Sequence, residues 1–134
     1  MRRTALLSLA LDFVLVVVFA AIGRANHGEA VLPGLFGTVW PFAVALGVAW
    51  IALLAWRAPL RPVRTGLPVW AITVAGGLLL RGVTGGGTAL PFIIVTAITL
   101  GVFLVGWRLI AAAVSRSRAK ARAKARANTA SPVE

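Results

Sequence analysis

The chain has 134 residues, of which 60% are hydrophobic and 13% charged, so it has room for one domain and is far more apolar than a soluble domain. It contains no cysteine and one histidine, and three acidic residues accompany 14 lysines and arginines, for a net charge of +11. These counts exclude disulfides and thiolate chemistry and leave too few ligands for a metal cluster. We therefore expect an integral membrane protein that holds no metal or cofactor.

The first apolar segment, residues 4–23, is long enough to cross a bilayer and carries a carboxylate, Asp12, near its middle. A charge at that depth costs about 2.5–3.5 kcal/mol unless it is paired, neutral or hydrated, so we expect a compensating group. A cleavable signal peptide is the alternative interpretation because Arg2 and Arg3 precede the segment. Against it, the apolar run is long for a signal peptide and Asp12 interrupts it.

The following connection, GRANHGEAVLPGLFGT, contains Arg24 and the single histidine, His27. Arg24 is expected to reach the outer membrane interface, because about 18 Å of the same helix separates it from Asp12. His27 could titrate near physiological pH under the influence of Glu29, and the alternative is a solvated histidine without a role.

The second apolar segment, residues 39–56, leads through the basic connection RAPLRPVRTG to the third, residues 67–83. Thr73, Gly77 and Arg81 fall on one stripe of the third helix. The long side chain of Arg81 can reach toward the middle of the membrane, so Arg81 is the predicted partner of Asp12.

A glycine-rich reversal, RGVTGGGT, leads to the fourth segment, residues 89–114, in which Thr96 and Thr99 are neighbours. Its glycines are not followed by Lys-Ser or Lys-Thr, so a phosphate-binding loop is not expected. The polar residues of the spans predict a small polar interior that comprises Asp12, Thr73, Arg81, Thr96 and Thr99. Asp12 could serve there as half of an ion pair that sets helix register, as a protonatable or cation-binding group in a translocation path, or as a group in a water-filled crevice.

The tail, residues 115–134, carries a basic residue at every second position from Arg116 to Arg126. This spacing scatters charge around a helix, so we expect a disordered or loosely helical arm without an amphipathic face. The arm is expected to bind anionic lipid headgroups, whereas nucleic-acid binding is disfavoured by the lack of aromatic side chains for stacking. The lipid-binding candidates are Arg116, Arg118, Lys120, Arg122, Lys124 and Arg126.

The basic residues outside the apolar segments are distributed unequally between the two sides. Twelve of the 14 lie at the N-terminus, in the second connection or from Arg108 onward, and only Arg24 and Arg81 belong to the opposite side. Because cytoplasmic loops retain lysine and arginine, the sequence predicts a multi-pass protein of the cell membrane with both termini in the cytoplasm.

The second and fourth segments resemble each other. The second segment runs from Pro41-Phe42 to Trp56-Arg57, and the fourth runs from Pro91-Phe92 to Trp107-Arg108. The pattern predicts an all-α architecture of two similar helical hairpins. The alternative is that proline at helix starts and Trp-Arg at the interface arose separately as generic anchors.

Several of these residues together resemble a known family. Asp12, the Gly23-Arg24-x-x-His27 turn, the two Pro-Phe pairs and Arg81 make residues 5–110 similar to the small four-helix bacterial membrane proteins of the domain of unknown function 3054 family. The resemblance implies the four-span topology and no established activity.

Two classes of function remain open. One is a small transporter or channel, oligomeric because four short helices enclose little polar volume, in which Asp12 and Arg81 couple or gate. The other is a non-transporting membrane subunit or scaffold that binds partner proteins or anionic lipid. No catalytic triad is formed by the single histidine and Asp12, so an enzyme is not expected, and a lipid-modifying protein with arginine clusters is the remaining enzymatic alternative.

Overall fold

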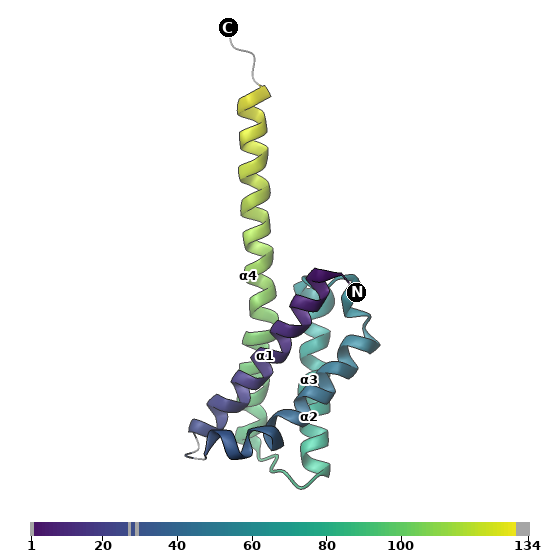
Figure 1. Ribbon diagram of the computed structural model, residues 1–134, viewed down its shortest axis with the longest axis vertical. Coiled ribbons are helices and arrows are strands. Elements are labelled where there is room, and N and C mark those ends of the chain that lie inside the picture. Colours follow the sequence, from purple (N-terminus) through teal and green to yellow (C-terminus); the bar gives the residue numbers. More distant parts are fainter. Residues whose placement is uncertain (1, 27, 29, 131–134) are drawn as a thin grey trace.

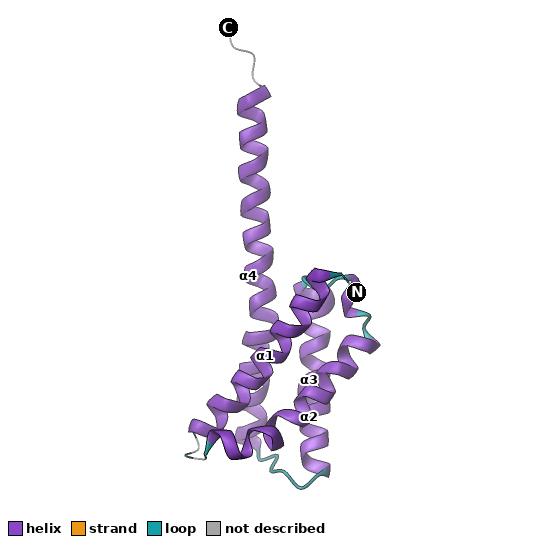
Figure 2. Cartoon of the chain, in the orientation of Figure 1, coloured by secondary structure: helices purple, strands orange, loops and turns teal. Residues whose placement is uncertain are grey.

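The structure, a computed structural model, describes residues 2–26, 28 and 30–130, and this part of the chain is helical without strands (Figure 2). Four long helices account for most of it: α1 (Arg3–Asn26), α2 (Val31–Ala52), α3 (Leu67–Val83) and α4 (Leu90–Ala130) (Figure 1). Between α2 and α3 lie a short 3₁₀ helix, η1 (Ala55–Arg57), and a single π-helical turn, η2 (Pro62–Gly66).

The helices form a closed bundle. α2 packs most extensively on α3, α3 also contacts α4, and α1 closes the ring through contacts with α2 and α4. The beginning of α1 lies at the same end of the bundle as the part of α4 that extends beyond it (Figure 1). The α1–α2 and α3–α4 connections therefore meet at the other end.

The surface of this bundle is apolar and its interior contains charge. Leu7, Phe36 and Ile98 are among the large hydrophobic side chains that are more than half exposed, whereas Asp12 and Arg108 are completely buried. Four helical segments are long and apolar enough to cross a membrane, and the third of them, Pro62–Val83, consists of η2 together with α3. Lipid is the solvent that suits such an exterior, so the fold is that of a membrane protein.

The helix boundaries differ from the sequence-based ranges in an instructive way. α3 begins and ends where predicted, but α2 begins eight residues before the predicted start at residue 39 and contains Pro41 in its interior. Pro33 lies in the first turn of α2, where the sequence-based range places Pro41. Because an internal proline lacks an N–H and crowds the preceding turn, α2 bends, and Figure 1 shows its first turns running at an angle to the rest.

The end of α2 is also earlier than expected. The helix stops at Ala52, and Leu54 adopts a left-handed conformation with φ of 50° before η1 begins. By contrast, α4 extends beyond the predicted end at residue 114 and continues without interruption through the tail to Ala130.

The apolar core draws on all four long helices, most heavily on α1 and α2. The Phe19 and Phe42 rings make an edge-to-face contact with centroids 5.4 Å apart. Phe42 also lies against Gly77 of α3, so closely that a Cβ atom at Gly77 would overlap the ring. Glycine at this position therefore lets α2 and α3 approach each other, as small residues do in membrane helix packing.

Candidate functional site

Asp12 forms a buried ion pair with Arg108, and the predicted pairing with Arg81 is wrong. Arg108 Nη2 lies 2.6 Å from Asp12 Oδ2 and Nη1 lies 3.0 Å from Oδ1, so the guanidinium donates to both carboxylate oxygens. Neither side chain has solvent-exposed surface. Parallel donation of this kind is the strongest geometry available to an arginine and a carboxylate.

Two tryptophans complete the environment of the carboxylate. Trp50 Nε1 of α2 donates to Asp12 Oδ2 at 2.9 Å, and Trp107 Nε1 of α4 donates to Oδ1 at 2.8 Å. With the two bonds from Arg108, four N–H donors bind the carboxylate, which matches its roughly four acceptor positions. We call Asp12, Trp50, Trp107 and Arg108 the Asp12 cluster.

Arg108 is held on its other sides as well. Its Nε donates to the carbonyl of Pro59 at 2.8 Å and Nη1 to the carbonyl of Leu104 at 2.8 Å, while its guanidinium carbon lies 4.6 Å from the centre of the Trp107 ring. Gly66, in the π-helical turn, leaves room for the side chain, because a Cβ there would lie 3.1 Å from Arg108 Cδ. The Asp12 cluster thus joins α1, α2, α4 and the α2–α3 connection.

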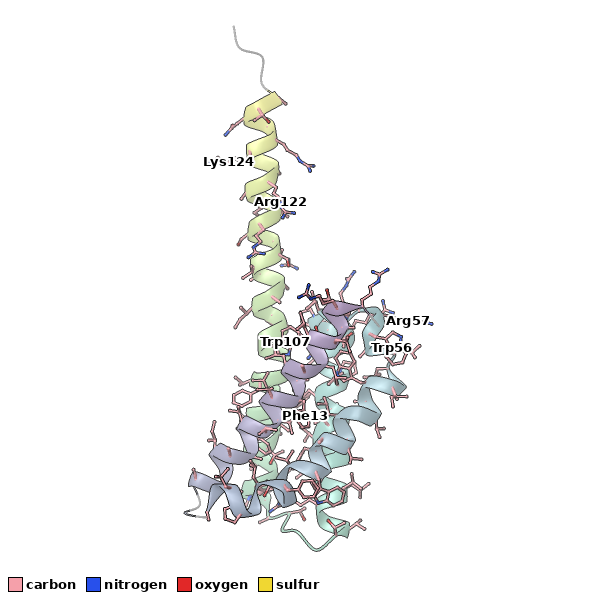
Figure 3. The ribbon with its side chains drawn as sticks, viewed as in Figure 1. Phe13, Trp56, Arg57, Trp107, Arg122 and Lys124 are labelled. Atoms are coloured by element: carbon pink, nitrogen blue, oxygen red, sulfur yellow. The ribbon has the colours of Figure 1, made fainter. Side chains whose placement is uncertain are left out.

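One sequence pattern indicates that Arg108 is buried, although its position after a tryptophan suggests an interfacial anchor. Thr96, Leu100, Leu104 and Arg108 are the buried residues of α4 and recur at every fourth position. Arg108 therefore continues a core-facing stripe, whereas its place directly after Trp107 is typical of an interfacial anchor. The corresponding Arg57, after Trp56, is exposed at the surface of η1, as expected for an anchor (Figure 3).

Arg81 lies instead at the end of the bundle where α3 leads into α4. Its Nε donates to the carbonyl of Gly87 at 2.8 Å, and its guanidinium carbon lies 4.5 Å from the centre of the Phe92 ring. These contacts hold the side chain close to its own connection, which is why it does not reach down to Asp12.

Arg24 occupies a corresponding place in the α1–α2 connection. Its Nε donates to the carbonyl of Ala30 at 2.9 Å, six residues later, as that of Arg81 does to Gly87. Nη1 of Arg24 also lies 3.4 Å from Thr38 Oγ1. In each connection a glycine with positive φ follows the arginine by four residues, Gly28 at 68° and Gly85 at 87°. The second outer candidate, His27, lies outside the described residues.

The three candidate threonines do not bind Asp12. Thr73 and Thr96 are completely buried, and Thr99 is half-buried. The hydroxyl oxygens of Thr73 and Thr96 have no hydrogen-bond partner within the described part of the chain. The predicted polar interior is therefore divided between a fully bonded cluster around Asp12 and isolated hydroxyls elsewhere.

Thr73→Val and Thr96→Val are each expected to leave stability unchanged or to raise it by about 1 kcal/mol, because valine has a similar shape and removes an unpartnered buried hydroxyl. Thr65→Val is the matched control. The Thr65 hydroxyl donates to the carbonyl of Ala58, so this variant is expected to lose about 1 kcal/mol. Thermal unfolding in detergent micelles measures all three. A loss of stability at Thr73 or Thr96 as large as that at Thr65 would show that these two hydroxyls do have hydrogen-bond partners.

The basic residues of the tail all lie on α4. Arg116, Arg118, Lys120, Arg122, Lys124 and Arg126 belong to a stretch, residues 113–130, in which every residue is exposed. Figure 3 shows Arg122 and Lys124 on the part of α4 that extends beyond the bundle. We call residues 113–130 the basic extension. Arg108 is the last buried residue before it.

No metal-binding group is formed by the described residues, in which no three His, Cys, Asp or Glu side chains gather. No curated protein and no solved structure matches the sequence. A family model described as "Protein of unknown function (DUF3054)" does match, over residues 9–111, which include the whole Asp12 cluster and both arginine-bearing connections. Since this match covers most of the chain, the protein belongs to the DUF3054 family of proteins of unknown function.

Proposed function

We propose that this protein is a non-transporting, non-enzymatic membrane scaffold whose bundle holds the basic extension at the cytoplasmic side, where the extension binds an acidic surface of a partner protein. The observation that carries the proposal is the saturated Asp12 cluster at the base of the extension. Arg108, the last buried residue of α4, joins that helix to α1 and to the α2–α3 connection.

The same cluster weighs against a transport role for Asp12. A carboxylate that exchanges a proton or a cation needs a free acceptor position and a route to water. Asp12 has four bonded donors and no exposed surface, so exchange would require the helices to separate. The pair of Asp12 and Arg81, which the sequence predicts as the coupling or gating element of a transporter, also does not form.

The geometry of the extension favours a protein partner over the lipid leaflet. At 1.5 Å per residue, Arg116 lies about 12 Å and Arg126 about 27 Å beyond Arg108 along a straight helix. Arg108 itself lies at the depth of Asp12, inside the span, so the first of these basic residues lie near the headgroups and the last lie beyond them. At physiological ionic strength charges are screened beyond about 8 Å, so the far end of the extension is attracted only weakly to the leaflet. An acidic protein surface can approach the extension from any side, which suits charge that is distributed all around a helix.

The orientation and the hairpin architecture form part of this proposal. The N-terminal Arg2 and Arg3, the α2–α3 connection and the basic extension belong to one end of the bundle, and positive charge on that side favours the cytoplasm of a bacterial-type cell membrane. The matched connections around Arg24 and Arg81 support two similar hairpins. They do so better than the Pro-Phe pairs, because Pro41 is internal to α2 whereas Pro91 is the second residue of α4.

Photocrosslinking in intact cells tests the partner. A photoreactive amino acid replaces Ala121 in the full-length protein, and the matched variant carries glutamine at all six basic positions of the extension. A discrete protein adduct is expected from position 121, and the glutamine variant should lose it while keeping its abundance. The same amino acid at Phe36, exposed on α2 near the other end of the bundle, should not give that adduct.

A second measurement separates the partner from the alternatives. A spin label on a single cysteine at position 122 should remain accessible to water-soluble reagents whether the vesicles contain neutral or anionic lipid. Accessibility that falls with anionic lipid, an adduct destroyed by nuclease, or ion flux in proteoliposomes that Asp12→Asn abolishes in a folded protein would each overturn the proposal.

A further inference from the structure

A cavity of about 320 Å³ lies at the end of the bundle opposite the basic extension. Most of its wall is apolar and includes Phe19 and Ala20 of α1 and Phe92 and Val95 of α4. The polar side chains that line it are Arg24, Thr38 and Arg81. We call this space the arginine cavity. Its volume is within the range of small-ligand sites, which are mostly apolar with a few polar groups that orient the ligand.

The structure holds Arg81 in place on the cavity wall. Gly87 accepts from Nε, and the Phe92 ring lies below the guanidinium. Gly86 gives the side chain room, since a Cβ there would lie 2.5 Å from Arg81 Cγ. Among the described residues no carboxylate pairs with Arg81 and no acceptor binds its Nη1 and Nη2 groups, so these donors remain available at the cavity.

Arg24 places a second guanidinium on the same wall. Ala30 accepts from its Nε, Thr38 lies near Nη1, and the absence of a side chain at Gly34 leaves space for the guanidinium. α4 begins at Leu90, and Ala89 and Pro91 also border the cavity, so the positive end of that helix faces the same space. The arginine cavity therefore combines two guanidinium groups at its polar side with hydrophobic walls.

We infer that the arginine cavity binds an amphipathic phosphate, with the phosphate at Arg81 and Arg24 and the alkyl portion along Phe19, Phe92 and Val95. Arginine binds phosphate oxygens through paired N–H groups, and the ring of Phe92 and the aliphatic wall suit an acyl or alkyl chain. Since the cavity opens at the end of membrane-length helices, where lipid headgroups lie, an anionic phospholipid of the surrounding leaflet is the ligand that meets both requirements.

Binding to the purified full-length protein in a non-ionic detergent tests this inference, with dodecyl phosphate as the probe and inorganic phosphate as the headgroup alone. Dodecyl phosphate is expected to raise the unfolding temperature in a concentration-dependent manner. Arg81→Gln is expected to weaken its binding at least tenfold, since a charge-assisted hydrogen bond is lost. Arg64→Gln, at an exposed arginine on the other end of the bundle, is the matched control and should leave binding unchanged.

A second variant keeps the test valid if Arg81→Gln impairs folding. Val95→Trp retains both arginines and is expected to fill the cavity, because Val95 lines it and is about half exposed. Native mass spectrometry from nanodiscs should show retained phosphatidylglycerol in preference to phosphatidylcholine, and both Arg81→Gln and Val95→Trp should reduce it. Equal binding of inorganic phosphate and dodecyl phosphate, or unchanged dodecyl phosphate binding in both variants, would overturn the inference.

Discussion

Replacing Asp12 by alanine is expected to destabilise the protein by about 3–5 kcal/mol, because it breaks a buried ion pair. The variant leaves the Arg108 guanidinium buried without a counter-charge, and it also removes the acceptors of the Trp50 and Trp107 N–H groups. Arg108→Ala is expected to cost a similar amount for the converse reason. Thermal unfolding in detergent micelles and abundance in membranes measure the effect.

Three further variants test whether the loss of stability comes from the Asp12–Arg108 ion pair. Arg108→Lys keeps the charge but cannot reproduce the donors to Asp12, Pro59 and Leu104, so most of the loss should remain. The double variant Asp12→Leu/Arg108→Met removes both charges and should be more stable than either single variant. Arg57→Met, which changes the exposed arginine of the other Trp-Arg pair, is the matched control and should be nearly neutral. Additive losses in the double variant would show that the two residues do not act as a pair.

Gly77→Ala is expected to cost about 1–3 kcal/mol because it overpacks the contact between α2 and α3. A Cβ at this position would overlap the Phe42 ring, which is itself completely buried and packed against Phe19. Either the ring or the helix must move, and both belong to the most extensive interface of the bundle. The measurement is the midpoint of thermal unfolding in the same detergent.

The chain offers a control and a rescue for this prediction. Gly47→Ala, within α2, meets nothing within 4 Å and should be neutral or stabilising by up to about 1 kcal/mol through helix propensity. Phe42→Leu, combined with Gly77→Ala, should recover part of the loss because leucine leaves space where the ring edge was. If Gly77→Ala proved as harmless as Gly47→Ala, the close packing of α2 on α3 would be refuted.

Much of the secondary structure can be predicted from hydropathy and from the residues that punctuate the apolar runs. The bounds of α3 follow from the sequence because Arg64 and Gly66 precede its apolar run and Arg81 and Gly85 close it. The predicted start of α2 is displaced because Pro41 resembles a start signal, although the helix already includes the apolar residues before it and has Pro33 in its first turn. Proline inside a membrane-length helix is tolerated by a bend, and local sequence cannot distinguish that case from a true start.

The sequence predicts that Asp12 has a charged partner, but it does not predict which residue that partner is. That a carboxylate in a membrane helix requires a partner follows from its desolvation cost, and Asp12 has one. The sequence favours Arg81 because it is the basic residue inside an apolar run, and it disfavours Arg108 because tryptophan followed by arginine is a common interfacial pair. In the structure, the tryptophan of that pair donates to the same carboxylate.

The sequence by itself determined the membrane-length helices, the concentration of basic charge at one end and the need for a partner at Asp12, because each depends on the cost of transferring local groups into lipid. The tertiary structure alone decided which arginine meets Asp12, that Trp50 and Trp107 saturate it, and that Arg24 and Arg81 face one cavity. Those outcomes depend on how helices far apart in the chain are rotated and placed in depth. Close contacts such as Gly66 with Arg108 and Gly77 with Phe42 set that arrangement, and no local pattern encodes it.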